Sequence, residues 1–291
     1  LHPANGNPIT LPTQDMVLGI YYLTKLHPKA KGTGLSFGSF EEVEIAYNEG
    51  VVAKHAAIKL RIIDRDEETG VINMNEETGL PKHTMIDTTV GRVIFNKIVP
   101  EEAGYINELL SKKSMRVIIS RIYRLAGLVK TVNFLDDLKD LGFKEAFRGG
   151  LSFSLSEVLI PPEKEKFIEE ANTKIEEVRS NYEMGLITEN ERYNQIIDKW
   201  TFADNRITDN LMKELAEHKQ GFNSVYMMLH SGARGSKQQI KQLCGLRGLM
   251  AKPRKSRLSH LRPDMADTGS LGATELLLVV CVAAVAIALF D

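Results

Sequence analysis

Apolar and polar positions near the start of the chain alternate between helical and strand-like spacing. A short helical pattern covers residues 16–23 within an irregular segment rich in Pro, Gly and Asn. Ser39 opens a Ser-x-x-Glu capping box, which predicts a helix that begins at Phe40 and stops before Gly50. Apolar residues then alternate over residues 56–63, and this period of two indicates a strand. The first part of the chain is therefore expected to mix helices with some β-structure.

Further helical patterns follow a polar, acidic stretch at residues 64–80 that is typical of an exposed hairpin or loop. The three patterns lie near residues 89–99, 113–125 and 134–141. A glycine-rich stretch at 142–155 is expected to end this unit, and Pro161-Pro162 marks a boundary. The resulting fold class is α+β, mostly helical, with an irregular mixed first domain.

The next apolar stripe predicts an antiparallel pair of helices. Its members recur at spacings of four, four, three and four, as on one face of a helix: Phe167, Ala171, Ile175, Val178 and Tyr182. A second capping box at Thr188 opens the partner helix. Its apolar side consists of Tyr193, Ile196 or Ile197, Trp200, Ile207, Leu211 and Leu215. The two helices form a hairpin of about 30 Å with charged outer faces, more often a docking surface than a reaction site.

Residues 223–252 carry the most informative pattern. Their apolar positions have helical spacing, Asn223 or Ser224 is suited to cap them, and one continuous helix would be about 40 Å long. Four glycines interrupt this segment: Gly232, Gly235, Gly245 and Gly248. Each interior glycine costs about 1 kcal/mol relative to alanine, so the pattern favours a helix that bends or lies close to a ligand.

The same segment is strongly basic. Its cations are Arg234, Lys237, Lys241, Arg247 and Lys252, with no Asp or Glu between Gln220 and Lys252. In one helix Arg234, Lys237 and Lys241 would share a face, and cations without neutralising acids suit phosphate groups. Composition alone favours the simpler alternative, a solvated basic face.

Overall composition excludes several classes. The 291 residues are 43% hydrophobic with a net charge of −1, so no global field attracts the chain to nucleic acid. The two cysteines and seven histidines have no metal-ligand spacing, and no Walker loop or Gly-x-Ser-x-Gly motif occurs. The carboxylates of Asp64 and Asp66 are better explained as a solvated acidic turn than as a metal site. Residues 276–290 form an apolar run that is short for a membrane span.

Five sequence strings resemble the β′ subunit of bacterial DNA-directed RNA polymerases, in the same order. They are HPANGNPITLPTQDMVLGIYYLT (residues 2–24), DTTVGRVIFNKIVP (87–100), RIYRLAGLVKTVNFLDDLKDLGF (121–143), GLITENERYNQIIDKW (185–200) and SGARGSKQQIKQLCGLRGLMAKP (231–253). These matches are long and colinear, and together they extend over nearly all of residues 2–253. The chain is accordingly similar to one central part of that subunit.

The resemblance implies a role for each part of the chain. Residues 1–155 would be the pore domain beside the active centre, and 156–221 the funnel, or secondary-channel rim, where transcript-cleavage factors dock. Residues 222–253 would be the bridge helix, which faces template DNA and the 3′ end of the nascent RNA. Residues 254–291 do not resemble the family, and a frameshift or chimeric gene is expected there.

Site residues, cofactor and partners follow from the same resemblance. The expected nucleic-acid-binding residues are Arg234, Lys237, Lys241 and Arg247. Those expected near the active centre or the nucleotide entry are Gln14, Asp15, Arg192 and Arg206. The reaction would be template-directed RNA synthesis with Mg²⁺ bound by an Asp-rich loop outside this chain. The expected partners are the β, α and ω subunits, a sigma factor, DNA and RNA. The expected location is the bacterial cytoplasm, at the nucleoid. No membrane contact is expected unless residues 254–291 are a genuine part of the protein.

Two features leave alternatives open. The chain begins with Leu1 instead of Met and lacks the Asp-rich loop, so it is expected to be a fragment without polymerising activity of its own. One rival hypothesis is a truncated module that binds transcription factors through the helical hairpin, and another is a membrane-tethered basic protein. His230 stands where the family usually has an acid, which would change the local charge of the bridge helix.

Overall fold

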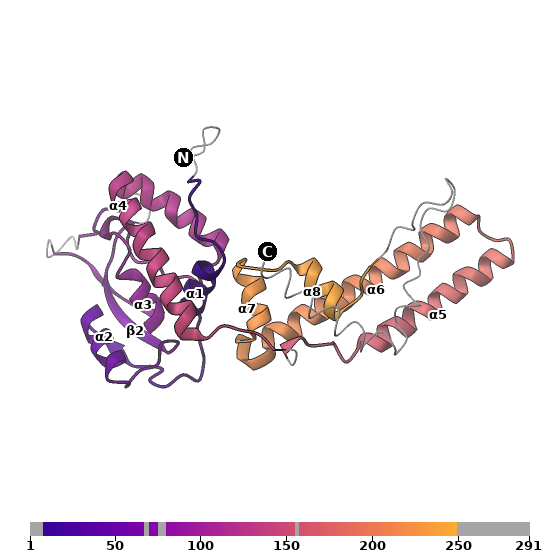
Figure 1. Ribbon diagram of the computed structural model, residues 1–291, viewed down its shortest axis with the longest axis horizontal. Helices are drawn as coiled ribbons and strands as arrows, with labels where there is room; N and C mark the ends of the chain where they lie inside the picture. Colours follow the sequence, from indigo (N-terminus) through magenta and orange to yellow (C-terminus); the bar gives the residue numbers. More distant parts are fainter. Residues whose placement is uncertain (1–7, 67–69, 75–79, 155–156, 249–291) are drawn as a thin grey trace. The chain divides into compact units, whose positions relative to one another are not determined.

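The computed structural model describes residues 8–66, 70–74, 80–154 and 157–248, which fall into two units (Figure 1). Within these ranges, the first unit consists of residues 8–152 and 227–234, and the second of residues 153–226 and 235–248. Helices dominate the described residues, and the first unit adds a three-stranded sheet. The predicted class, α+β and mostly helical, is confirmed.

The sheet of the first unit is built around the predicted strand. β2 (Ala57–Ile63) pairs in parallel with the short β1 (Ser36–Phe37) and antiparallel with β3 (His83–Thr89). Ile58 and Leu60 are buried while the alternate residues face solvent, as the period of two requires. They pack in a cluster with residues from the neighbouring helices and loops: Val43, Val52, Ala56, Val90 and Val93.

Side-chain caps set the starts of the helices beside this sheet. The Ser39 hydroxyl accepts a hydrogen bond from the Glu42 backbone N–H at 3.3 Å, so α2 (Phe40–Asn48) begins where the capping box predicts. The Glu42 carboxylate accepts from the Gly38 N–H at 2.7 Å, one residue earlier than in a standard capping box. α3 (Val90–Asn96) is capped in the same way by Thr89, and the 3₁₀ helix η1 (Glu101–Ala103) follows it.

A long helix packs against the first helix of the chain. α4 (Lys112–Gly149) contains both predicted patterns, 113–125 and 134–141, joined through a kink at Gly127 (φ 77°). The pattern expected near residues 134–141 continues as helix to Gly149, and Gly142 lies where α4 crosses α1 (Asp15–Thr24). A Cβ atom on Gly142 would lie 2.9 Å from the Met16 Cα, so glycine here permits close packing inside the helix.

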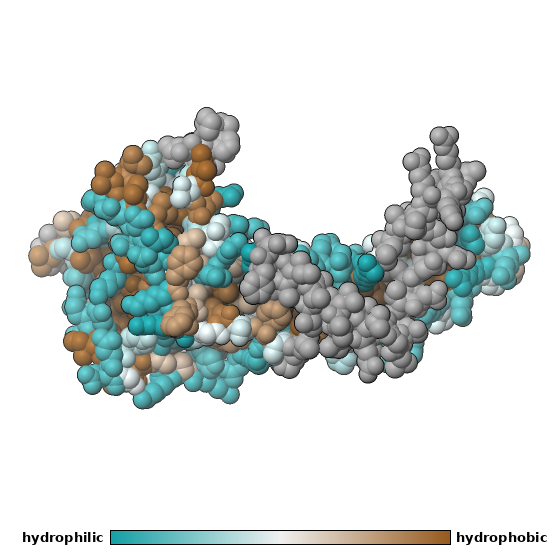
Figure 2. Space-filling model, viewed as in Figure 1, coloured by the Kyte–Doolittle hydropathy of each residue, from teal (hydrophilic) through white to brown (hydrophobic). Residues whose placement is uncertain are grey.

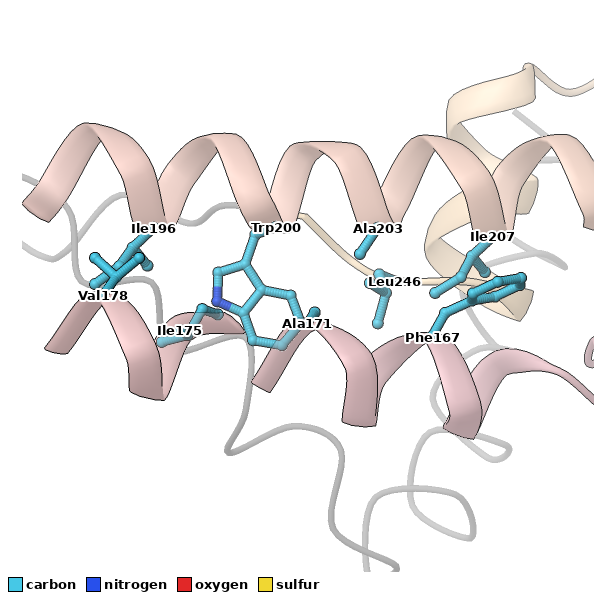
Figure 3. Packing of buried hydrophobic residues seen from close by; sticks show 9 residues of the cluster. All are labelled: Phe167, Ala171, Ile175, Val178, Ile196, Trp200, Ala203, Ile207 and Leu246. Atoms are coloured by element: carbon cyan, nitrogen blue, oxygen red, sulfur yellow. The ribbon is translucent and has the colours of Figure 1, made fainter. Parts of the chain in front are cut away.

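The second unit contains the predicted helical hairpin. α5 (Lys164–Glu183) and α6 (Glu189–Glu217) pack through one apolar core (Figure 3), and Thr188 forms the predicted reciprocal capping box with Glu191. The core side chains are Phe167, Ala171, Ile175, Val178, Ile196, Trp200, Ala203, Ile207 and Leu246. Tyr182 was expected in this stripe, but it is 37% exposed and lies under the Arg192 guanidinium.

The single helix expected over residues 223–252 is wrong for the described part of the segment. The 3₁₀ helix η3 (His218–Gly221) precedes α7 (Ser224–Ser231), and α8 (Lys237–Cys244) follows after a break. Gly232 (φ 73°) and Gly235 (φ 82°) have positive φ values, which break the regular geometry of a right-handed α-helix. The glycines were expected to let one helix bend. In the structure the helix is instead completely interrupted between α7 and α8.

Hydrophobic side chains also reach the surface of the first unit, visible as brown areas in Figure 2. On α4 they include Val117, Leu128, Val129, Val132, Phe143 and Phe147, the last of which is 89% exposed. None of the helices in the described ranges is long and apolar enough to cross a membrane. The apolar run at 276–290 lies outside those ranges.

Candidate nucleic-acid interface

The basic segment begins at a buried asparagine. The Asn223 side chain accepts a hydrogen bond from the Tyr226 N–H at 3.0 Å, which makes Asn223 the predicted cap of α7. Its amide nitrogen donates to the Glu157 carbonyl at 3.0 Å and lies 2.9 Å from Nδ1 of His218. The start of the segment is therefore fixed by polar contacts as well as by helix formation.

The break between α7 and α8 has its own hydrogen bonds. The Ser231 hydroxyl donates to the Met228 carbonyl at 3.1 Å and accepts from the Ala233 N–H at 3.2 Å. Ser236 then forms a reciprocal capping box with Gln239, which starts α8 independently of α7. A capping box in the middle of the expected helix was a signal visible in the sequence, and it predicts the observed helix start.

A histidine near the end of α7 contacts α1. Nδ1 of His230 lies 3.0 Å from the Tyr21 hydroxyl, and the two rings are 5.6 Å apart at a tilted angle. Nζ of Lys25 lies 3.5 Å from the same hydroxyl. Burial, and then the charge of Lys25, lower the pKa of His230. The imidazole is therefore stabilised in its neutral form, and His230 adds no positive charge to the segment at neutral pH.

Two of the expected nucleic-acid-binding lysines are neutralised by acids on α6. Nζ of Lys241 contacts Oδ2 of Asp204, and the side chains are only 15% and 8% exposed. Nζ of Lys237 lies 3.4 Å from Oδ1 of Asp209 in an exposed pair. The expectation that these cations lack neutralising acids is wrong, because the acids come from another part of the chain.

The two arginines of the segment differ from the lysines. Arg234 is half-buried and Arg247 is exposed, and neither forms an ion pair within the ranges that the structure describes. The expected shared face of Arg234, Lys237 and Lys241 is also wrong, since Arg234 precedes the Ser236 cap and is not in α8. Arg234 and Arg247 thus remain the better candidates for binding phosphate groups.

The residues expected near nucleotide entry lie in both units. Gln14 caps α1 with a positive φ of 51°, its carbonyl accepts from the Leu18 N–H at 3.0 Å, and Asp15 begins the helix. Both side chains are exposed. Arg192 lies 4.5 Å from the centre of the Tyr182 ring and 3.7 Å from the Glu189 carboxylate. These contacts do not test whether Gln14, Asp15 and Arg192 lie near nucleotides, so that role stays a prediction.

Arg206 is held along the hairpin by its neighbours. Its guanidinium lies 4.4 Å from the centre of the Phe167 ring, and Nη1 is 3.4 Å from the Glu170 carboxylate. A planar guanidinium over an aromatic face stabilises local packing. Its observed contacts connect α5 to α6, and no signal in the sequence of α6 alone predicted them.

The acidic loop after β2 forms ordinary surface ion pairs. Asp64 lies 3.8 Å from Lys82, and Arg65 lies 3.5 Å from Glu101. Among the described residues no three His, Cys, Asp or Glu side chains gather so that they could hold a metal ion. The residues described here therefore do not fit the magnesium ions of a nucleotidyl transferase.

Comparison with known proteins places the chain among RNA polymerase subunits. A family model described as RNA polymerase Rpb1, domain 3 matches residues 1–158, and one described as RNA polymerase Rpb1, domain 4 matches residues 187–272. The chain belongs to the RNA polymerase Rpb1 family, and the resemblance to β′ subunits is confirmed. The second match continues past residue 253, where the resemblance was expected to stop.

Individual relatives agree with this assignment. Over 256 residues the chain is 56% identical to the DNA-directed RNA polymerase subunit β′ of Azobacteroides pseudotrichonymphae genomovar. CFP2. Identity is 55% to the β′ subunit of Porphyromonas cangingivalis and 54% to that of Bacteroides fragilis (strain YCH46). Each alignment covers 88% of this chain but only 18%, 21% and 17% of the respective relative. The chain thus spans about a fifth of the length of these curated relatives.

Proposed function

We propose that the chain acts as part of the β′ subunit of a DNA-directed RNA polymerase and supports template-directed synthesis of RNA from nucleoside triphosphates. The observation that carries this proposal is the identity of 54–56% to β′ subunits over 88% of the chain. In the complete enzyme, Mg²⁺ would supply activation of the RNA 3′ hydroxyl. The other polymerase subunits, a sigma factor, DNA and RNA are the proposed partners.

The finer roles follow from the resemblance and from the contacts above. Residues 1–155 would line the route of nucleotide entry, and residues 222–253 would face the template and the RNA. Arg234 and Arg247 would bind phosphate oxygens, which positions nucleic acid without reading its sequence. Lys237 and Lys241 would contribute less, because each already contacts a carboxylate.

The helical hairpin, residues 156–221, would serve as a docking surface for transcript-cleavage factors. Its tip exposes two apolar side chains, Met184 (63%) and Leu186 (70%), in the turn between α5 and α6. Exposed apolar groups at the end of a charged hairpin suit a protein partner. The same observation supports a second candidate function, a module that binds such factors without taking part in polymerisation.

A segment exchange tests the main proposal. The part of the Bacteroides fragilis β′ subunit that matches this chain is replaced by the corresponding residues of this chain, and the assembled enzyme is assayed for extension of a primed RNA. We expect extension within about tenfold of the parent enzyme, a cost of at most about 1.4 kcal/mol in transition-state stabilisation. The 291-residue chain alone should show no extension. An exchanged subunit that assembles but makes no RNA would contradict the proposal.

The hairpin proposal needs a separate measurement. In the exchanged enzyme, Met184→Asp with Leu186→Asp should abolish binding of a transcript-cleavage factor and leave RNA extension unchanged. Glu183→Gln, a neighbouring change without loss of apolar surface, serves as the control. If the chain captures the factor but never joins the other polymerase subunits, the second candidate function replaces the first.

A further inference from the structure

A carboxylate is buried on a face of α6 that does not pack against α5. Asp204 is 6% exposed, and Thr208, one turn further on, is equally buried. The α5-facing stripe consists of Ile196, Trp200, Ala203 and Ile207 (Figure 3). An aspartate is almost never buried without a partner. The segment around α8 provides the cover and the partner.

The partner of Asp204 is a lysine that is nearly as buried. Lys241 contacts Oδ2 of Asp204, whereas Oδ1 is buried and has no hydrogen-bond partner within the described residues. Lys241 is thus the one cation that compensates the buried Asp204 carboxylate in this part of the chain. Removal of one partner from such a pair leaves an uncompensated charge, which is far more damaging than loss of an exposed pair.

Apolar contacts hold the same segment in place. Ile240 is 9% exposed and Cys244 is 1% exposed on α8. Beyond the helix, Leu246 reaches into the hairpin core near Phe167 and Ile207 (Figure 3). The ion pair and the apolar side chains therefore form one continuous packing surface that holds residues 237–246 on the hairpin. This surface is called the seat of α8. The pair of Lys237 with Asp209 lies at the exposed margin of this seat.

We infer that Asp204 is a positioning residue: through its buried pair with Lys241 it fixes α8 on α6 and removes Lys241 from contact with nucleic acid. The phosphate-binding role then falls to arginines of the segment, with Arg247 as the exposed example in this unit. The fixing of α8 concerns this chain by itself. The consequence for nucleic acid rests on the proposed function.

Hydrogen–deuterium exchange on the full 291-residue chain tests the first part. Lys241→Met keeps the length of the side chain but leaves Asp204 uncompensated, so amide exchange in residues 239–244 should accelerate about tenfold or more. The double variant Asp204→Leu with Lys241→Met replaces both charges by apolar groups and should exchange within about threefold of the parent. Asp209→Asn, which breaks only the exposed pair, should also remain within about threefold.

Each result of this experiment has a definite meaning. Unchanged exchange in Lys241→Met, or acceleration in Asp209→Asn as large as in Lys241→Met, would overturn the inference. If Lys241→Met unfolds the second unit altogether, the double variant decides. Protected residues 239–244 in that variant support the positioning role, and unprotected residues refute it.

The salt dependence of the exchanged polymerase tests the second part. The logarithm of transcription-complex stability falls with the logarithm of salt concentration, and the slope changes by about 0.7–0.9 for each phosphate group that the protein no longer neutralises. Lys241→Met should leave this slope unchanged, whereas Arg247→Met should reduce it by that amount. A reduced slope in Lys241→Met would overturn the inference. If the polymerase that carries the segment of this chain makes no RNA, the proposed function is refuted. The hydrogen–deuterium exchange result for α8 would still hold.

Discussion

The Tyr21 hydroxyl lies 3.0 Å from Nδ1 of His230 and thereby joins α1 to the end of α7 across 209 positions of the chain. Tyr21 is fully buried, and burial together with Lys25 lowers the pKa of His230. His55 has a related environment: Nδ1 lies 3.0 Å from the Lys25 carbonyl, and burial lowers the pKa of His55 to about 4. Both of these imidazoles are therefore stabilised in their neutral forms.

The first unit should lose stability as the pH falls below about 6.5, the usual pKa of histidine. Between the lowered folded pKa and this value the unfolded chain binds more protons, so acid favours unfolding. For His55 the window extends from about 6.5 down to about 4. The expected loss for His55 is about 1–3 kcal/mol, reduced by its partial exposure.

Thermal unfolding of the full chain between pH 7.5 and 5 measures this effect. His55→Gln with His230→Gln should flatten the dependence of Tm on pH, because neither amide titrates. His83→Gln changes an exposed histidine of β3 and serves as the control, with an unchanged dependence. A Tm profile that His83→Gln alters as much as the double variant would contradict the assignment.

The stability of the first unit should also depend on a buried ion pair between a loop and α4. The Lys54 ammonium contacts the Glu145 carboxylate, and the side chains are 14% and 3% exposed. Arg148 lies 3.6 Å from the same carboxylate. Glu145→Ala should lower the free energy of unfolding by about 3–5 kcal/mol, because it leaves Lys54 buried without its partner.

Urea denaturation compares this variant with a matched surface pair. Glu44 lies 2.9 Å from Lys97, but both side chains are more than half exposed. Glu44→Ala should therefore cost less than about 1 kcal/mol. Equal losses for the two variants would show that burial does not determine the strength of the Lys54–Glu145 pair.

The elements predicted correctly from sequence are those specified by local signals. Ser39 and Thr188 form capping hydrogen bonds within three residues, so their sequence spacing alone sets the helix starts. The stripe from Phe167 to Val178 is buried because its spacing matches one face of a helix that is half covered. Tyr182 continues that spacing but lies beside the turn that joins α5 to α6, where it is 37% exposed and the Arg192 guanidinium lies over its ring.

The features that sequence missed depend on contacts between distant residues. Lys241 was counted as an unpaired cation because its acid, Asp204, lies 37 positions earlier, outside the segment in which charges were compared. α4 continues past Gly142, where it packs closely on Gly19 of α1, a contact that no local pattern predicts. The Ser236 capping box was a local signal for the break before α8, and continuous apolar spacing obscured it.

The crossing of α1 and α4 should be intolerant of a single methyl group. A Cβ atom on Gly19 would overlap the Gly142 carbonyl oxygen and lie 2.8 Å from the Ala146 nitrogen. Because these are backbone atoms of a packed helix, they move little, and Gly19→Ala should cost about 1–3 kcal/mol or more. Gly38→Ala is the control, since its Cβ would meet only the flexible Glu42 carboxylate at 3.4 Å. Equal Tm values for the two variants would refute the close crossing.

Alanine in place of the two glycines before α8 should shift residues 224–244 toward one continuous helix. Gly232 and Gly235 have φ values of 73° and 82°, where an L-residue costs about 1–2 kcal/mol each. In a continuous helix the same alanines are favoured over glycine by about 1 kcal/mol each. The combined bias of about 4–6 kcal/mol opposes the packing of α8 on α6, which the Lys241–Asp204 pair and the buried Ile240 and Cys244 side chains stabilise.

A bias of this size should make a change in helix continuity measurable. Amide exchange of residues 232–236 in the full chain should slow in Gly232→Ala with Gly235→Ala. Gly34→Ala, with φ 94° and open space around its Cβ, introduces similar strain elsewhere and should leave residues 232–236 unchanged. If the double variant exchanges as fast as the parent, the seat on α6 outweighs backbone preference. In that case the break before α8 is set by Lys241 and Asp204 rather than by the glycines.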